Sequence, residues 1–142
     1  IWRKELRPDS GGAGKTRGGL GQYMEVGAQE GHEFDIQAMF DRVDHPARGR
    51  RGGKQGAPTT IVQDDGSAMN GKGKQLVPHG RRVVMAFPGG AGYGDPSERP
   101  VELVKRDLAR GYISAEVAAT DYKLSAADIA NVQAAVVRGD KI

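Results

Sequence analysis

PDSGGAGKTRGGLG, from Pro8 to Gly21, decides the fold of this sequence, together with PGGAGYGDP from Pro88 to Pro96. The glycines of these two segments are too dense for ordinary connecting loops. Each glycine lets the chain adopt a positive φ or lets two backbones approach closely, and each adds to the entropy lost on folding. We therefore expect both segments to be backbone-packing parts of a folded domain.

Glycine-rich chains have a specific way of packing. Extended polyproline-II-like segments can lie side by side when glycine repeatedly removes the side chains between them. We predict some of this geometry here, and ordinary glycine turns are the alternative.

Composition limits the size of the hydrophobic core. The chain has 142 residues, of which 22 are glycine, about twice the usual share, while hydrophobic residues make up 37% and aromatic residues 6%. We expect a single domain over 1–142, with a glycine-rich β part over 1–96 and a short helical tail over 97–142. Because so little apolar area gives a thin core, an obligate subunit is favoured over a free-standing enzyme.

The net charge of +3 and the isoelectric point of about 9.3 raise the question of nucleic-acid binding. The run Arg48 to Lys54 is basic and glycine-rich, within a segment, 44–58, that has no periodic apolar pattern. Since no aromatic residue is interleaved with the run and we expect no aromatic ring nearby that would stack bases, a solvated loop or a protein-interface patch is favoured over an RNA site.

The sequence has no cysteine, which excludes disulfides, thiolate nucleophiles and cysteine-ligated metals. No apolar run approaches a membrane span and no signal-peptide pattern opens the chain, so we expect a soluble, cytoplasmic protein.

Period-two alternation follows the first glycine segment. It is mixed over 22–28 and clearer over 34–41, where Phe34 and Ile36 fall on one side of the chain. This is the period of a half-buried strand. Because Gly31 supplies a turn, we predict that the two strands form a hairpin.

Three further strands are predicted before the second glycine segment. Residues 59–62 are β-branched and end at the turn Asp65-Gly66, and residues 76–77 and 82–87 follow. The last strand stops at Pro88, since proline cannot donate to a ladder.

Helical spacing appears after Pro96. A helix is predicted over 100–110 with Gly111 as its C-terminal cap, a short one after Ser114, and a third from Ser125 to about Gly139. Strands first and helices last predict an α+β fold. It would be β-rich, with barrel-like or sandwiched sheets and glycine-rich extended segments, followed by short C-terminal helices.

Gly14-Lys15-Thr16 resembles the end of a phosphate-binding P-loop. However, Asp9 stands where that motif needs its first glycine, and the glycines of 18–21 follow where a helix should begin. We favour a tight glycine corner in which Asp9 and Ser10 satisfy backbone donors.

Residues 89–94 resemble a dinucleotide fingerprint only in their glycine content. Asp95-Pro96 follows directly, so no helix N-terminus is presented to a pyrophosphate. We favour a packing turn that connects the last strand to the helices.

The nearest candidate metal ligands are His32, Asp35, Asp41 and His45. His32 and Asp41 would lie on opposite sides of a continuous strand, which argues against convergence. His79, between proline and glycine, fits a surface or hydrogen-bonded loop histidine.

Asp64-Asp65 fits a turn, and no Ser/His/Asp or carboxylate-pair arrangement can be argued from the spacing. We therefore assign no catalytic, cofactor-binding or metal-binding residue to this chain.

The order of the motifs resembles the C-terminal part of the hydantoinase B/oxoprolinase family. The resemblance rests on five segments at plausible separations, 6–15, 17–21, 88–96, 111–114 and 121–122. In that family these motifs usually end a polypeptide several times longer. The resemblance therefore implies a fragment or a separately encoded small subunit, similar to the small (beta) subunits of acetophenone carboxylases.

The resemblance implies that this chain is a small structural or site-supporting subunit of an enzyme complex. That complex would be an ATP-dependent carboxylase (a ligase) that acts on a ketone such as acetophenone and consumes bicarbonate and ATP. ATP with magnesium would bind to partner subunits, which would be larger hydantoinase A-like and hydantoinase B-like chains. No cofactor is expected in this chain itself.

Two alternatives remain open. One is a subunit of an ATP-dependent hydantoinase or oxoprolinase that hydrolyses a cyclic amide, and the other is a nucleic-acid-binding module built on Arg48 to Lys54. Residues 9–16 are the segment that could reach an active site at a subunit interface.

Overall fold

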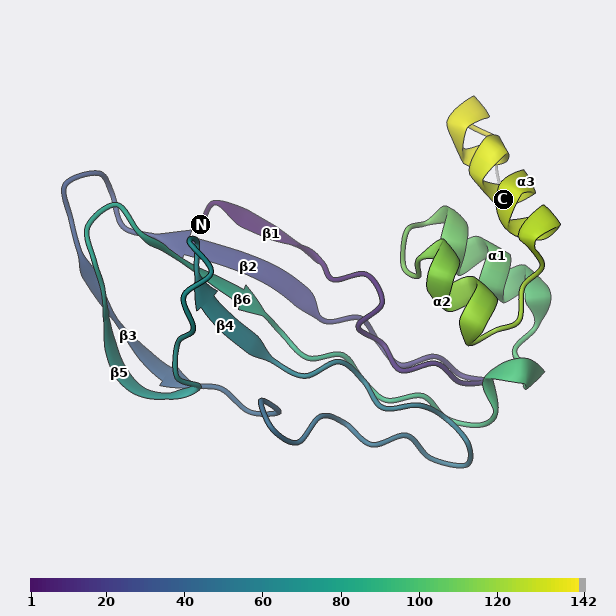
Figure 1. Ribbon diagram of the computed structural model, residues 1–142, viewed down its shortest axis with the longest axis horizontal. Helices are drawn as coiled ribbons and strands as arrows, with labels where there is room; N and C mark the ends of the chain where they lie inside the picture. Colours follow the sequence, from purple (N-terminus) through teal and green to yellow (C-terminus); the bar gives the residue numbers. More distant parts are fainter. Residues whose placement is uncertain (141–142) are drawn as a thin grey trace.

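The computed structural model describes residues 1–140, with strands between residues 3 and 86 and helices after residue 95. This order confirms the predicted α+β class. The molecule is elongated, with the strands at one end, the helices at the other, and extended glycine-rich segments between them (Figure 1).

The larger sheet has four antiparallel strands in the order β1-β2-β6-β4. They are β1 (Arg3–Leu6), β2 (Gln22–Gly27), β4 (Thr60–Gln63) and β6 (Arg82–Ala86). Strand β6 lies inside the sheet, and its Val83, Met85 and Ala86 are buried. The β-branched and apolar residues of the last strand therefore form the centre of this sheet.

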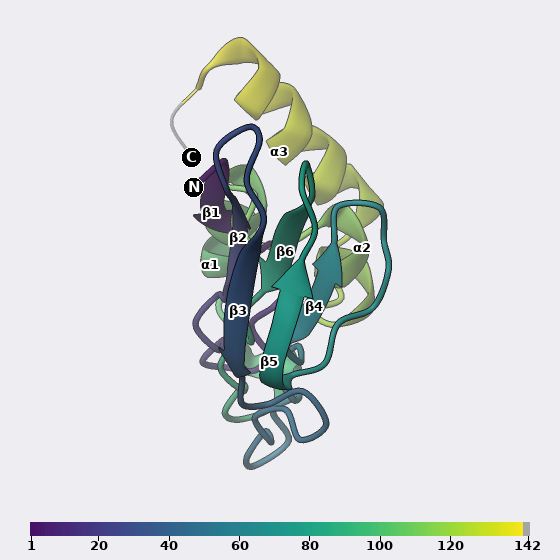
Figure 2. The same cartoon turned by 90° about the vertical axis from the view of Figure 1, so that its left-hand side faces the viewer.

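The second sheet is a two-stranded antiparallel ribbon of β3 (Phe34–Met39) and β5 (Lys72–Val77). In Figure 2 this ribbon lies in front of one face of the larger sheet. Val77 and Ile61 belong to one core that residues from both sheets share, so the two sheets form a small sandwich. Phe34 and Ile36 face this core, as the alternation over 34–41 predicts.

The predicted hairpin between residues 22–28 and 34–41 is wrong. Strand β2 pairs with β1 and β6, and β3 pairs with β5. The larger gain comes from pairing β2 with the buried strand β6, where Glu25 and Arg82 also form an ion pair across the two strands (2.6 Å). Local turn chemistry at Gly31 does not outweigh that burial.

Strand β1 was missed because all four of its residues, RKEL, are exposed. No apolar alternation marks it in the sequence. It forms because the outer edge of β2 offers it backbone hydrogen-bonding groups, and the pairing continues beyond the strand, where Arg7 N donates to Gly21 O (2.9 Å).

The helical tail contains η1 (Pro96–Glu98), α1 (Val101–Ala109), α2 (Ala115–Thr120) and α3 (Ala126–Arg138). Its caps confirm the predictions. Ser114 Oγ accepts from Val117 N, Ser125 Oγ accepts from Asp128 N, and Gly139 ends α3 with a φ of 78°.

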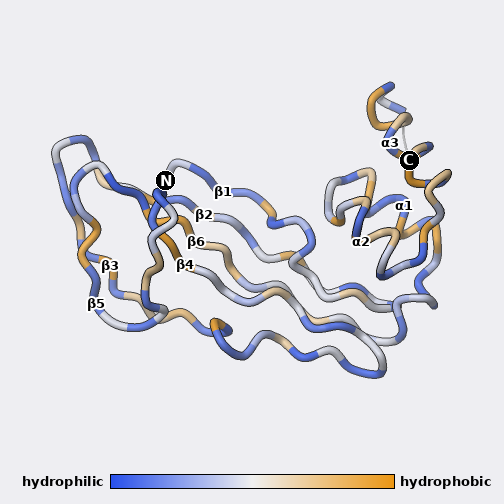
Figure 3. Tube along the Cα trace, viewed as in Figure 1, coloured by the Kyte–Doolittle hydropathy of each residue, from blue (hydrophilic) through white to orange (hydrophobic). Residues whose placement is uncertain are grey.

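Hydrophobic residues gather on β4, β6 and parts of the helices, whereas the segments between them are pale or hydrophilic (Figure 3). The sandwich and the helical tail thus have separate small cores. Within residues 1–140 no helix is both long and apolar enough to cross a membrane.

Three extended segments, 8–21, 47–57 and 88–94, connect these two cores, and we call them the glycine bundle. Apart from isolated bridges they are neither helix nor strand. In Figure 1 they run alongside one another between the larger sheet and the helices.

Backbone hydrogen bonds join the segments of the bundle. Gly12 N donates to Gly90 O (2.9 Å), Lys54 N to Ala13 O (2.7 Å), and Gly92 N to Lys54 O (2.9 Å). These contacts confirm that the glycines pack segments side by side.

Close approach explains why the bundle needs glycine. A Cβ added at Gly18 would collide with the carbonyl oxygen of Gly90, and one at Gly92 would collide with that of Ala13. The atoms in the way are backbone, so no side-chain rotation relieves the overlap.

We expect Gly18→Ala to lower the free energy of unfolding by about 2 kcal/mol or more, because two backbone segments must separate. Gly19→Ala is the matched control, since a Cβ there meets nothing within 4 Å. The control should change stability by less than about 1 kcal/mol. Urea unfolding of both variants tests this, and equal destabilisation would contradict close packing at Gly18.

Candidate functional site

Residues 9–16, the segment that could reach an active site, form a corner of the glycine bundle. Ser10 is fully buried; its hydroxyl donates to Arg7 O (2.6 Å) and accepts from Gly21 N (2.8 Å). Asp9 has a φ of 58° and accepts from Ser114 N (2.7 Å). The expectation that Asp9 and Ser10 satisfy backbone donors is confirmed.

A phosphate cradle needs backbone N–H groups that point at the ligand. Along this corner the N–H groups of Gly12, Lys15 and Thr16 donate instead to other backbone carbonyls. The ammonium of Lys15 pairs with Glu98 at 3.0 Å on the exposed surface. The resemblance to a P-loop therefore has no counterpart in the geometry.

Residues 89–94 use their backbone donors in the same way. Gly90 N, Gly92 N and Gly94 N donate to the carbonyls of Gly19, Lys54 and Arg50 at 2.8, 2.9 and 2.9 Å. This segment is a packing element that leads into η1, not a pyrophosphate site.

A buried ionic cluster fixes the helical tail to the bundle. Asp107, on α1, accepts from Arg17 Nε (3.0 Å) and Arg99 Nη2 (2.7 Å), and its side chain is only 2% exposed. Arg17 comes from the bundle and Arg99 from the link before α1. One carboxylate between two guanidinium groups thus joins three parts of the chain.

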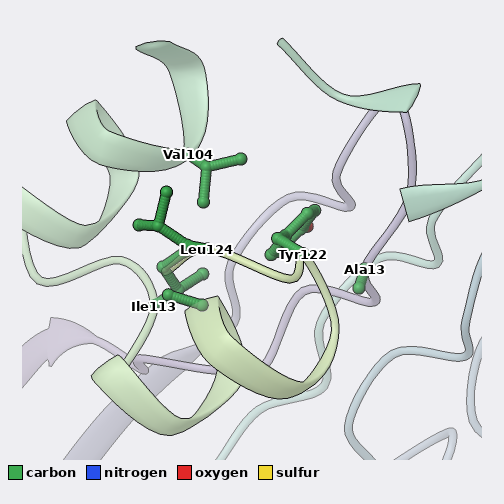
Figure 4. Close-up of a cluster of buried hydrophobic side chains, with 6 residues drawn as sticks. Ala13, Val104, Ile113, Tyr122 and Leu124 are labelled. Atoms are coloured by element: carbon green, nitrogen blue, oxygen red, sulfur yellow. The ribbon is translucent and has the colours of Figure 1, made fainter. Parts of the chain in front are cut away.

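An apolar cluster packs beside these charges. Figure 4 shows Val104, Ile113, Leu124 and Tyr122 of the helical tail, with Ala13 of the bundle next to the tyrosine ring. Burial raises the pKa of the Tyr122 hydroxyl. The core of the tail is therefore completed by a residue of the glycine bundle.

The candidate metal ligands do not converge. Asp35 pairs with Lys74 (2.8 Å), whereas Asp41 and His45 line an open cavity of about 490 Å³ and His32 lines a different one. Across residues 1–140 no group of three or more His, Asp or Glu side chains is arranged to hold a metal ion.

The other polar candidates are local. His79 Nε2 accepts from Gly31 N (2.8 Å), as expected of a hydrogen-bonded loop histidine. Asp65 accepts from both N and Oγ of Ser67, and these hydrogen bonds lower the pKa of its carboxyl. Asp64-Asp65 is thus the predicted turn.

The basic run Arg48 to Lys54 is part of the bundle. Lys54 pairs with Asp121 (2.6 Å), and the guanidinium of Arg51 lies 5.8 Å from the centre of the Tyr93 ring. The expectation that no aromatic ring lies near this run is wrong. Tyr93 is distant in the sequence, and the bundle brings it there.

The Asp107 cluster was not predicted from the sequence. The signal was present, because Asp107 follows Val104 by three residues and so lies on the apolar face of the predicted helix. A carboxylate on a buried face requires cationic partners. Their identity, Arg17 and Arg99, could not be read from the sequence.

Comparison with known proteins identifies the family. The sequence model of the hydantoinase B/oxoprolinase family matches residues 1–96. The chain belongs to this family.

Three curated relatives share its sequence. A protein of Methanocaldococcus jannaschii is 38% identical over 127 residues, and the beta component of caprolactamase from Pseudomonas jessenii is 30% identical over 133 residues. The B-type component of a putative D-/L-hydantoinase from a Pseudomonas species is 29% identical over 136 residues. These alignments cover 87%, 86% and 90% of this chain, but only 22% of each relative's length.

Two solved structures share its fold. The ATP-dependent caprolactamase of Pseudomonas jessenii superposes with a TM-score of 0.72 at 26% identity, over 96% of this chain and 26% of that chain. Acetone carboxylase superposes with a TM-score of 0.61 at 18% identity, over 96% and 24%, and shows the fold alone.

We expect Asp107→Ala to lower the free energy of unfolding by about 3–5 kcal/mol, because two nearly buried guanidinium groups lose the carboxylate between them. Glu98→Ala is the control, since it breaks the exposed pair with Lys15 and should change stability by less than about 1 kcal/mol. Denaturant unfolding measures both, and hydrogen exchange should show faster opening of α1 in the Asp107 variant. Equal effects would contradict the anchoring role.

Proposed function

We propose that this chain serves in an ATP-dependent enzyme complex that hydrolyses a cyclic amide. The observation that carries the proposal is the 30% identity to the beta component of caprolactamase over 86% of this chain. The TM-score of 0.72 with the ATP-dependent caprolactamase and the sequence similarity to a putative hydantoinase support it.

Within such a complex we assign this chain a structural or site-supporting role. The glycine segments use their backbone donors on one another, and Asp107 joins the helical tail to the bundle. In this proposal ATP and magnesium bind to larger hydantoinase A-like and hydantoinase B-like parts of the complex.

Carboxylation of a ketone, such as acetone or acetophenone, is the second candidate. Its support is the shared fold with acetone carboxylase, at a TM-score of 0.61. The cyclic-amide proposal is preferred because its relatives also share sequence with this chain.

Purification from the native source under mild conditions, with mass spectrometry of the co-eluting chains, tests the proposal. We expect hydantoinase A-like and B-like sequences, either as separate subunits or as parts of one longer polypeptide. The purified complex should then consume ATP with caprolactam or a hydantoin, and not with acetone or acetophenone plus bicarbonate. ATP consumption with the ketones alone would favour the second candidate, and elution as a free folded monomer would refute both.

Lys15→Ala tests whether the P-loop-like corner takes part in turnover. Because the Lys15 ammonium is exposed and pairs only with Glu98 among the described residues, we expect assembly and ATP-coupled turnover to stay within about twofold of wild type. A variant that assembles normally but loses turnover would place this lysine at the active site instead.

A further inference from the structure

Arg48, Arg50, Arg51 and Tyr93 lie together at one turn of the glycine bundle, which we call its tip, and this tip carries an excess of positive charge. Arg48, Arg50 and Arg51 are all exposed, and none of them forms a salt bridge within residues 1–140. Nearby cations of the bundle differ in this respect, since Lys15 pairs with Glu98 and Lys54 with Asp121. The three arginines therefore form a local excess of positive charge.

An aromatic ring completes this tip. Tyr93 is 49% exposed, and isolated backbone bridges hold it between Thr16 on one side and Arg50 on the other. The Arg51 guanidinium lies 5.8 Å from the ring centre, within cation–π range. Arginine and tyrosine are among the residue types most enriched at the energetic centres of protein interfaces.

The backbone holds the tip in one arrangement. Arg50 N donates to Gly92 O (3.1 Å), and Gly53 N donates to Arg50 O (3.0 Å). Between them Arg51 has a φ of 50° and Gly52 a φ of 90°, and this tight turn leaves the Arg51 side chain at the surface. A surface that is ordered before binding loses less entropy when a partner docks.

We propose that this tip, formed by Arg48, Arg50, Arg51 and Tyr93, docks an acidic segment of a partner protein. Carboxylates of the partner pair with the arginines, and a flat or apolar side chain covers the Tyr93 ring. The inference deepens the proposed function, on which it rests for the identity of the partner as a subunit of the same complex.

The single exposed ring favours a protein partner over single-stranded nucleic acid. Strand binding without sequence preference relies on a series of aromatic rings that stack successive bases, whereas this tip, among the described residues, offers one ring.

Fluorescence anisotropy with the purified chain tests the tip. The probes are a short labelled peptide of alternating glutamate and tyrosine and a short labelled oligothymidylate, each at low and at physiological salt. We expect the peptide to bind wild type, and Arg50→Ala/Arg51→Ala to weaken it at least tenfold. The control, Lys4→Ala/Arg110→Ala, removes the same charge from exposed cations elsewhere and should change affinity less than twofold. Tyr93→Leu should weaken binding several-fold.

The other outcomes overturn the inference. Equal loss in the tip and control variants would mean non-specific attraction, and no binding to wild type at low salt would mean no docking site. Tighter binding of the oligothymidylate, lost in the tip variant, would assign the tip to nucleic acid.

Co-elution separates this inference from the proposed function. If the native complex assembles equally well with Arg50→Ala/Arg51→Ala, the tip is not its interface and the proposed function stands. If the chain binds the peptide through the tip but never co-elutes with hydantoinase-type subunits, the tip stands and the proposed function fails.

Discussion

Backbone contact without Cβ atoms is the constraint on which this structure depends. In the glycine bundle the carbonyls of Ser10, Ala13 and Gly90 occupy the space that side chains at Gly89, Gly92 and Gly18 would need. Segments at this separation hydrogen-bond directly, so the bundle is held by its main chain and needs almost no apolar core. This explains how a chain with only 37% hydrophobic residues forms an extended, ordered middle section.

The ends of the molecule use that middle section in different ways. The sandwich has its own core around Val77 and Val83, with strands continuing into the bundle. The helical tail does not close its core alone, because it takes Ala13 from the bundle and fixes Asp107 between two arginines. Since a buried carboxylate is tolerated only with its partners in place, the position of α1 is set by the bundle.

The sequence predicts the parts of this fold whose signal is local. Capping residues and helical spacing located the three helices, and alternation located β3 and the face that Phe34 presents to the core. Strand pairing had no local signal, because β2 pairs with β6, which is distant in the sequence. Strand β1 had none either, because it forms at the edge of the sheet without an apolar pattern. The Arg51–Tyr93 contact and the Asp107 cluster were not predicted from the sequence for the same reason, because their members are distant in the sequence and the bundle brings them together.

The geometry of the bundle also bears on what the chain does. Glycine-rich loops that bind phosphates leave backbone donors free, whereas here Gly12 N, Lys15 N and Thr16 N in the first segment, and Gly90 N, Gly92 N and Gly94 N in the second, donate to carbonyls within the fold. The surface instead offers apolar and cationic groups: Trp2 at the N-terminal strand, Val137 on α3, and the arginines at the tip of the bundle. Relatives in which the matching region makes up only 22% of the chain have further polypeptide with which to cover such surfaces. Exposed apolar and cationic groups of this kind fit the supporting role that we propose for this chain.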